Sequence, residues 1–556
     1  MFMLTSPSTT TRTTTSDQNQ ALTVRNGLTA ELQADELRKN GNGLALASIA
    51  NTDDTNDNTE SETVAPVVLV RLPNGVPLAP HYQRLLDYFA RDVLASLSVH
   101  PAIHHDLAQG LVPAMLHEPH LLSAGLALSA AGLASRGLSD IGGIGLPRVI
   151  EHLQISGLAL LRQAVESRRQ QGGDNLVATC LLWCLADVFA ADASASSWRI
   201  HLQGIQALLG GVRALDAFVA RGRTVSSSSA STSRSAMGHL SQLYLSLQTL
   251  PHVARCRNEA MADRTIEEEN DDNDKEDEGE TDDRIGPTPV EPNTATATAM
   301  PGPRIDGFLG CSVELFDILQ QVEQLASTMP AIDVENKDED VDVDYDDEFD
   351  DDNILAAPHL KGPARVTAET LLARALVQAL EPKEVHTITT SSTASSSSTA
   401  TTTTATPVIH HIPAPALTPA AAREFAFCHG CFQQATLIHV YRRLFRLPSC
   451  AALIQRAVCA IRRMAGQMTQ GAPCSAWVAM ALPLFTAGCE AFLPTSQAWA
   501  HAALDSFAAS IGSRHVQLLR RALEDVWRLR ARLGDVDGRL CAEALLDELN
   551  YNIILF

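Results

Sequence analysis

Three stretches of biased composition interrupt the second half of the chain, and none of them can contribute to a packed core. Residues 259–284 contain fourteen Asp or Glu against three Arg or Lys, and residues 333–352 contain thirteen acids against Lys337. From about residue 384 to 418 the chain is almost pure Ser and Thr with Pro. Such segments bury too little apolar surface to offset the entropy that is lost on ordering. We therefore expect separate blocks of core-forming sequence, joined by disordered inserts.

The charge of the chain is concentrated in the two acidic runs. The formal net charge is −23, and the runs carry −11 and −12, so the remaining sequence is neutral overall. No basic surplus is left to attract nucleic acid or anionic lipid. Only five of the 42 basic residues are lysines, so no Lys-rich nuclear import signal or polybasic arm is visible.

Cysteine usage and hydropathy indicate an intracellular protein. Eleven cysteines in 556 residues are too few for a disulfide scaffold. The N-terminus has no apolar core of signal-peptide length. The longest apolar stretch, about residues 121–134, contains Ser123 and Ser129 and falls short of the ~18–20 residues that span a bilayer. We expect reduced thiols, and neither secretion nor a membrane anchor.

Outside the inserts, apolar residues recur three and four residues apart, as they do in helices. No run alternates with a period of two, so the sequence predicts an all-α fold. The segment LVATCLLWCLADVF is apolar nearly all round, which is typical of an enclosed central helix. The expected helices are one through Leu85 and Val93, 121–137 ending at Gly137, one from Ile150 to Ala164, 176–189, 198–209, one within 312–327, one within 366–381, one through Leu437 ending before Pro448, one from Ile454 to Met468, one containing Trp477 and Phe485 with a kink at Pro483, and one lined by Val516, Leu519, Leu523 and Val526.

These blocks and inserts predict one multi-helix domain that is interrupted several times. The expected boundaries are a disordered segment at 1–75, the first helical half at 80–255, an acidic and Pro/Thr-rich linker at 259–303, a helix at 305–330, an acidic linker at 333–358, a helix at 366–382, a Ser/Thr-rich linker at 384–418, and the second helical half at 420–556. A like-charge run is usually a solubilising linker. The alternative is a segment that contacts a basic partner or activates transcription.

The pair Cys428 and Cys431, with His429 between them, is the first candidate for metal binding. A zinc ribbon needs a second Cys-x-x-Cys about 15–20 residues further on. Cys450 lies at that distance, but Leu453 occupies the position of its partner. We therefore interpret these thiols as small apolar residues on a helix, and we assign no metal ligand.

Five histidines between residues 100 and 120 are the second candidate: His100, His104, His105, His117 and His120. Pro101 follows the first of them, and no Glu completes a metalloprotease spacing, so loop or capping roles are favoured. The segment GGIGLP (142–147) has no preceding strand and no following lysine, as a phosphate loop requires. No Gly-x-Ser-x-Gly motif is present. No catalytic, cofactor-binding, metal or DNA-binding residue is assigned, no cofactor is expected, and enzyme activity is not expected.

Several helical segments together resemble the fungal-specific transcription factor domain, the regulatory region that follows the binuclear zinc cluster in many fungal activators. They occur in the family's order, with the inserts between them. The segments are HYQRLLDYFARDVLASLSVHP (81–101), LLSAGLALSAAGLASRG (121–137), LVATCLLWCLADVF (176–189), SSWRIHLQGIQALL (196–209), IDGFLGCSVELFDILQQVEQLA (305–326), TLIHVYRRLFRLPS (436–449), LPLFTAGCEAF (482–492) and HVQLLRRALEDVWRLR (515–530).

The resemblance implies an all-helical regulatory region that controls activity, responds to effectors and contacts partners. Trp198, Gly204, Gly488 and Glu490 would then serve packing and helix junctions rather than a ligand site. The resemblance also implies a nuclear regulator of transcription, and many relatives regulate metabolic or biosynthetic genes.

One departure from the family concerns the N-terminal zinc cluster that contacts DNA. Members carry six N-terminal cysteines that bind two zinc ions beside basic residues, whereas the first cysteine here is Cys180. The first 64 residues contain four basic residues and nine acids. We expect this chain to act with DNA-bound factors or as a homodimer, without tight DNA binding of its own, unless an upstream exon encodes the cluster. The alternatives are a helical scaffold that no longer regulates genes and, third, an enzyme with an unrecognised helical site.

Overall fold

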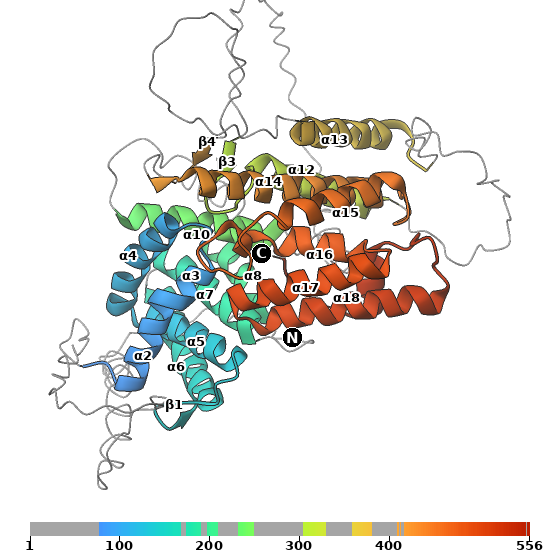
Figure 1. The fold of residues 1–556 in the computed structure, drawn as a ribbon. Helices are drawn as coiled ribbons and strands as arrows, with labels where there is room; N and C mark the ends of the chain where they lie inside the picture. Colours follow the sequence, from blue (N-terminus) through green and yellow to red (C-terminus); the bar gives the residue numbers. More distant parts are fainter. Residues whose placement is uncertain are drawn as a thin grey trace, which may run out of the picture.

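The computed structural model describes residues 77–167, 174–190, 197–209, 232–249, 304–329, 359–380, 408–410, 412, 416–551 and 553–555. The predicted disorder of residues 1–75, both acidic runs and most of the Ser/Thr-rich insert lie outside the described residues. Figure 1 shows the described elements as one all-helical body. The all-α prediction is confirmed, and the strands are four segments of two or three residues each.

The N-terminal half begins with a proline and ends with a polar-rich helix. Its elements are α2 (Pro80–Tyr88), the π-helical turn η1 (Phe89–Val93), α3 (Leu94–Ser96), α4 (Pro101–His117), α5 (Pro119–Ser135), β1 (Asp140–Ile141), β2 (Ile144–Gly145), α6 (Leu146–Ser167), α7 (Asp174–Ala190), α8 (Ser197–Leu209) and α10 (Thr232–Thr249). Pro is well placed at the start of α2, α4 and α5, where a backbone N–H would have no helical partner.

The described helices of the C-terminal half range from 7 to 21 residues. Its elements are β3 (Arg304–Asp306), α12 (Val313–Thr328), α13 (Gly362–Leu380), β4 (Val408–His410), α14 (Pro419–His439), the π-helical turn η5 (Val440–Leu444), α15 (Ala452–Ala465), the 3-10 turn η6 (Ala476–Ala479), α16 (Ala481–Cys489), α17 (Pro494–Ile511), α18 (Arg514–Leu533) and α19 (Ala542–Glu548). β3 and β4 pair in parallel, with Ile305 opposite Ile409.

Helices α5 and α7 form the centre of the N-terminal half. Burial in α5 is unbroken from His120 to Gly132, so the helix is enclosed on every side, as the all-round apolar pattern of such segments predicts. Close approach depends on small residues. A Cβ at Gly157 of α6 would lie 2.7 Å from both Ser123 Cβ and the Trp183 ring. The sequence therefore places glycine where three helices meet.

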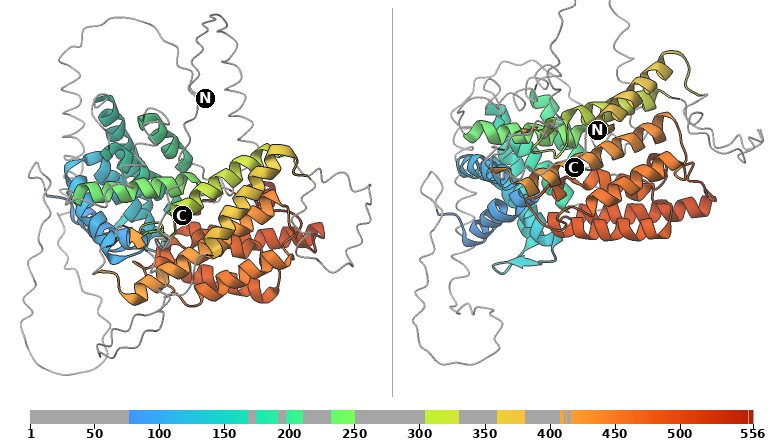
Figure 2. Two further views of the ribbon diagram at one scale, coloured as in Figure 1. Left: turned by 90° about the horizontal axis from the view of Figure 1, so that it is seen from above. Right: turned by 45° about the horizontal axis from the view of Figure 1, so that its top comes forward.

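Helix α14 has the same central position in the C-terminal half. All residues from Cys428 to His439 are buried, and α12, α13, α15 and α16 pack around them. Figure 2 shows these helices stacked beside the N-terminal half. A single hydrophobic core runs through both halves. The two halves also share backbone contacts, since the Cys474 amide donates to the Ala95 carbonyl over 3.0 Å.

The structure corrects several details of the prediction. Trp477 and Phe485 do not share a kinked helix, because Trp477 lies in η6 and Pro483 occupies the first turn of the separate helix α16, where its missing N–H is tolerated. Residues 305–312 are not helical, since Asp306 accepts the amides of Phe308 and Leu309 and turns the chain before α12.

The remaining corrections concern element boundaries. Helix α13 begins at Gly362 rather than at residue 366, and β4 lies within the segment predicted as a linker. Helix α10 was not predicted, because its sequence TSRSAMGHLSQLYLSLQT mixes polar and apolar residues without one clear stripe. It is nevertheless buried on several faces in the structure, including the side chains of His239, Ser241 and Gln242. The stop at Gly137 is confirmed by its φ of 90°.

Candidate functional site

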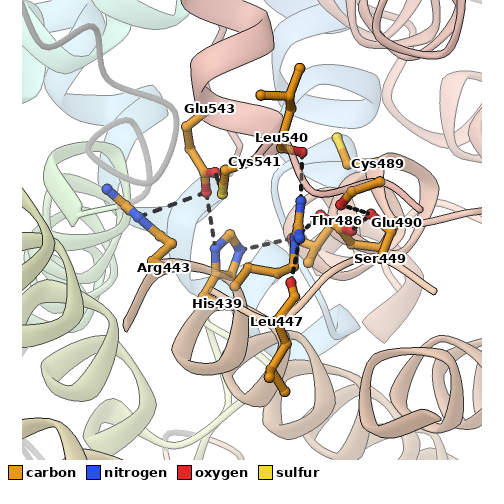
Figure 3. A network of polar contacts seen from close by, with 12 residues as sticks. His439, Arg443, Leu447, Ser449, Thr486, Cys489, Glu490, Leu540, Cys541 and Glu543 are labelled. Carbon is orange, nitrogen blue, oxygen red and sulfur yellow. Dashed lines mark hydrogen bonds and ion pairs between the residues drawn. The ribbon is translucent and has the colours of Figure 1, made fainter. Parts of the chain in front are cut away.

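Two consecutive arginines, Arg442 and Arg443, lie in the buried turn η5 that continues α14. Adjacent helical residues point in different directions, so the two guanidinium groups reach different partners. Arg442 is 3% exposed, and the Arg443 side chain is 10% exposed. Buried cations are retained in proteins when carboxylates pair with them. Figure 3 shows the polar network that these partners form.

The Arg442 guanidinium pairs with Glu490 at the end of α16. Its Nε donates to Glu490 Oε1 over 3.1 Å, and Nη2 donates to the Leu540 carbonyl over 2.6 Å. A third donor, Nη1, bonds the Leu447 carbonyl. The Arg442 and Glu490 side chains are 2% and 3% exposed. Because these bonds replace the lost hydration of both charges, the pair can persist in the core.

Ser449 connects this pair to the loop before α19. Its hydroxyl bonds Glu490 Oε2, and its backbone amide donates to the Gly538 carbonyl over 2.9 Å. Gly538 has a φ of 68°, and a Cβ there would lie 2.5 Å from Ser449 Cβ. The loop approaches so closely because residue 538 has no side chain.

Arg443 pairs with two carboxylates from distant helices. It bonds Glu323 of α12 through Nη2, and its Nε lies 3.8 Å from Glu543 Oε1 of α19. His439 Nδ1 lies 3.5 Å from the same Glu543 oxygen, while its Nε2 lies 3.0 Å from Thr486 Oγ1. The arginine therefore links α12 to the C-terminal helix α19.

The Glu543 carboxylate is largely buried, with 14% of its side chain exposed, and stays charged. Burial by itself raises the pKa of a carboxyl group, but the hydrogen bond from His439 and the positive charge of Arg443 outweigh it and hold the pKa of Glu543 well below its usual range. At neutral pH the network consequently contains paired ions rather than neutral acids.

A third arginine, Arg530 near the end of α18, shares an acceptor with Arg442. Its Nη2 donates to the Leu540 carbonyl over 3.1 Å and lies 3.8 Å from Glu490 Oε1. Asp535 holds the loop that carries Leu540, because its Oδ1 accepts the Arg539 amide over 2.6 Å. The network thus joins α12, η5, α16, α18 and the loop before α19.

The chemistry available in this network is that of a structural junction. The space that it leaves is a cavity of about 20 Å³, which has room for about one water molecule. Burial raises the pKa of Cys541 to about 12 and that of Cys489 well above its usual value, so neither thiol forms a reactive thiolate. Among the described residues, no group of three His, Cys, Asp or Glu is placed to hold a metal ion.

Comparison with known protein families shows the family to which this helical body belongs. The model of the fungal specific transcription factor domain matches residues 84–556, from α2 to the end of the chain. The chain belongs to this family. No curated protein and no solved structure matches it. Because the family consists of transcription factors, the fungal transcription factor domain described here has a role in regulating transcription.

In this transcription factor domain, the Cys428–His429–Cys431 segment is buried on α14. His429 Nδ1 accepts the Ser312 amide over 3.3 Å, and Cys431 Sγ donates to the Ile461 carbonyl over 3.8 Å. Cys450 is exposed in a loop after η5, away from a common ligand sphere. The structure places the two helical cysteines as core residues.

The clustered histidines of the domain have separate local roles. His100 is the N-cap of α4 and accepts the Ala102 amide at Nδ1 over 3.1 Å. His104 Nε2 lies 2.7 Å from the Ala90 carbonyl, and His120 is buried beside Glu118. His105 and His117 are exposed.

The remaining candidate residues fall into two groups. In the segment 142–147, Gly142 and Gly143 form the turn between β1 and β2 with φ of 61° and 81°. Trp198 is buried, and Gly488 accepts the Trp527 indole N–H over 3.0 Å. A Cβ built at Gly204 would have nothing within 4 Å among the described residues apart from its chain neighbours and its own helix backbone, so no close contact calls for glycine there.

Sequence reasoning identified Glu490 as a junction residue but missed its arginine partners. A usable signal was present: Glu490 is a lone acid within the apolar segment LPLFTAGCEAF, and Arg442 and Arg443 are two adjacent charges within a segment that forms a helix of the core. An isolated charge in a core-forming segment indicates a buried ion pair. The sequence does not show which charges meet.

Proposed function

We propose that this protein regulates a fungal metabolic or biosynthetic gene set in the nucleus, through a DNA-bound protein partner or as a homodimer. The observation that carries the proposal is the family match over residues 84–556, which includes nearly all of the described helical body. A body held by one continuous core and a buried ion-pair network is suited to presenting fixed surfaces to partners.

The surface charge favours a protein partner over direct contact with DNA. Two exposed arginines of α18 already face carboxylates: Arg520 lies 2.6 Å from Asp505, and Arg528 lies 3.0 Å from Glu524. Phosphates would have to compete with these acids for the arginines. The chain as a whole has a net charge of −23, which repels the DNA backbone at long range.

The test combines recruitment in cells with binding by the purified protein. We expect chromatin immunoprecipitation of the tagged full chain to recover specific promoters, and we expect recovery to be lost when the DNA-bound partner is removed. Purified protein should show no tight, salt-sensitive binding to duplex DNA. A binding constant that falls steeply between 50 and 200 mM salt would reveal several phosphate contacts and contradict the partner-mediated mechanism.

Two variants test whether recruitment requires the intact helical body. Arg442→Met breaks the buried network and should abolish recruitment, whereas Arg528→Met removes an exposed arginine and should leave recruitment unchanged. Exclusion of the wild-type chain from nuclei, with no promoter recovered, would favour the non-regulatory scaffold.

A further inference from the structure

A cleft of about 520 Å³ lies where the N-terminal and C-terminal halves of the helical body meet. Residues from three segments line it: 99–105 at the start of α4, 416–425 at the start of α14, and 474–476 before η6. Two other cavities in the described part of the chain measure about 40 and 20 Å³. Sites for small molecules usually occupy ~300–1,000 Å³ and often lie where domains or helices meet. The cleft therefore has the size and the place of a ligand site.

The inner side of the cleft is mostly apolar. Val99, Phe425 and Ala476 line it and are buried. The partly exposed Ala102 and Ala421 line it from the first turns of α4 and α14. Both halves thus contribute apolar surface, and alanines at the two helix starts leave the space between them open.

His100 fixes the walls of the cleft relative to each other. Its Nδ1 accepts the Ala102 amide over 3.1 Å at the start of α4, and its ring also bonds the Ala416 backbone just before α14. Burial lowers the pKa of His100, so the ring is uncharged at neutral pH. The histidine therefore joins the two halves without bringing a charge into the cleft.

Cys474 belongs to the third wall and has an unusual backbone conformation. Its φ is 52°, in the left-handed region that residues other than glycine seldom adopt. Its amide donates to the Ala95 carbonyl of the other half over 3.0 Å, which helps to hold this conformation. Strained residues of this kind cluster at binding and catalytic sites. Burial raises the pKa of the Cys474 thiol to about 11, so this wall is uncharged as well.

The carboxylate of the cleft already has partners within the protein. None of the described residues that line the cleft is Arg or Lys, and Glu424 supplies the carboxylate among them. Glu424 Oε1 accepts the Thr469 amide over 3.1 Å and also the Thr469 hydroxyl. A cation in the cleft would compete with these donors, and an anion would be repelled by the carboxylate. Since an ion also loses its hydration on entry, the walls favour an uncharged ligand.

We propose that this cleft is a binding site for an uncharged, largely apolar organic molecule of drug-like size. The molecule would contact Phe425 and Ala476 on the inner side and Ala102 on the α4 wall. Because the walls come from both halves, a bound molecule would stabilise their junction. A role as the effector of gene regulation rests on the proposed function, whereas binding to the cleft does not.

The first test titrates the purified full chain with prodan, a neutral naphthalene dye whose fluorescence rises in apolar surroundings. Ala421→Trp fills the cleft from the α14 wall and should weaken dye binding at least about tenfold. Ala416→Trp fills it from an exposed position and should have the same effect. The matched control is Ala420→Trp, at an exposed position outside the cleft, which should bind the dye as wild type does.

Three results of this titration are decisive. Absence of dye binding by the wild-type chain would overturn the proposal. Equal binding by Ala421→Trp and Ala420→Trp would also overturn it, because the dye would then bind elsewhere. If circular dichroism shows that Ala421→Trp has lost helical content, the comparison of Ala416→Trp with Ala420→Trp decides.

The charge of the ligand is tested with a cationic and an anionic derivative of the same dye. Both should bind at least about tenfold more weakly than the neutral dye. Tighter binding of the cationic derivative that is lost in Glu424→Gln would show that this carboxylate recognises the ligand, and would refute an uncharged ligand.

A photoreactive derivative of the dye locates the site in the wild-type chain. Cross-linked peptides should contain residues from 99–105, 416–425 or 474–476. Labelling confined to other surfaces, such as the exposed Phe492 and Leu493, would overturn the proposal. None of these assays involves DNA. A chain that binds the dye but reaches no promoter would refute the proposed function alone, and a chain that reaches promoters but binds no dye would refute the cleft alone.

Discussion

The α5–α7 region and the Arg442–Glu490 network are both buried, but different interactions stabilise them. Around α5 and α7 the buried surface is almost wholly apolar, and helices approach through glycine at 157. Around η5 the network contains three arginines and three glutamates joined by hydrogen bonds and ion pairs. Apolar packing, which rests on dispersion and the hydrophobic effect, tolerates small shifts of its side chains. An ion pair that is shielded from water depends on each of its hydrogen bonds.

This contrast predicts how each region responds to substitution. An apolar core loses stability in proportion to the volume changed. A buried charge network loses far more when one member is removed, because the remaining charge stays in the core without a partner. The predictions below test that difference, from the largest effect to the smallest.

Removing one member of the network should have the largest effect. Arg442→Met removes the arginine that donates to Glu490 and leaves only the more distant Arg530 beside this buried carboxylate, and should lower the free energy of unfolding by about 3–5 kcal/mol. Urea unfolding followed by circular dichroism measures it. Adding Glu490→Leu to the same chain should restore much of the loss, and Arg528→Met at an exposed pair should change stability by less than about 1 kcal/mol. Equal losses for Arg442→Met and Arg528→Met would contradict a desolvated network.

The folded chain should lose stability as pH falls below neutral, because of its buried histidines. Burial lowers the pKa of His515 and of His429 to about 4 in the folded chain, the first partly offset by the Ile554 carbonyl. The unfolded chain takes up protons near pH 6.5, so the folded state loses stability as pH falls from about 6.5 to 4. The loss is of order 3 kcal/mol for each histidine.

The histidine prediction is checked by urea unfolding at a series of pH values. His515→Gln should flatten the dependence in this window by roughly half, with His429 and His100, whose pKa burial also lowers, supplying the rest. Glu543 does not interfere, because its depressed pKa makes its contribution disappear only below about pH 4.3. An unchanged slope in the variant would show that His515 is protonated in the folded chain.

A small overfilling of the apolar region should have an intermediate effect. Gly157→Ala places a methyl group 2.7 Å from both Ser123 Cβ and the Trp183 ring, and should destabilise the chain by about 1–3 kcal/mol. Thermal unfolding by calorimetry measures the shift. Tolerance of this methyl group would mean that α5, α6 and α7 can separate without penalty.

The smallest effect should be a gain at a loosely packed glycine. Gly204→Ala in α8 meets no described residue within 4 Å, so helix propensity dominates and the chain should gain about 0.5–1 kcal/mol. The same calorimetric assay compares it with Gly157→Ala. A loss of stability at residue 204 would restore the packing role that its sequence context indicated.

Elements that are defined by nearby residues could be predicted from the sequence. Helix α18 follows the expected face, with Val516 and Leu523 buried and Glu524 lying 3.0 Å from Arg528. The start of α5 at Pro119 and its end before Gly137 follow from proline and glycine chemistry. The sequence did not predict helix α10, because this helix is buried by its contacts with α4, α7 and α12 and has no clear apolar stripe of its own.

By itself the sequence determined the helical fold class, the neutral balance outside the acidic runs and the family, because each depends on composition or on spacing within one segment. The tertiary structure decided which charges meet: Arg442 finds Glu490 across 48 positions, and Arg443 finds Glu323 and Glu543 on two different helices. It also decided that α13 packs on α12, α14 and η5, with its apolar stripe in the common core. Partners so far apart in the chain are set by helix packing, and no local pattern records them.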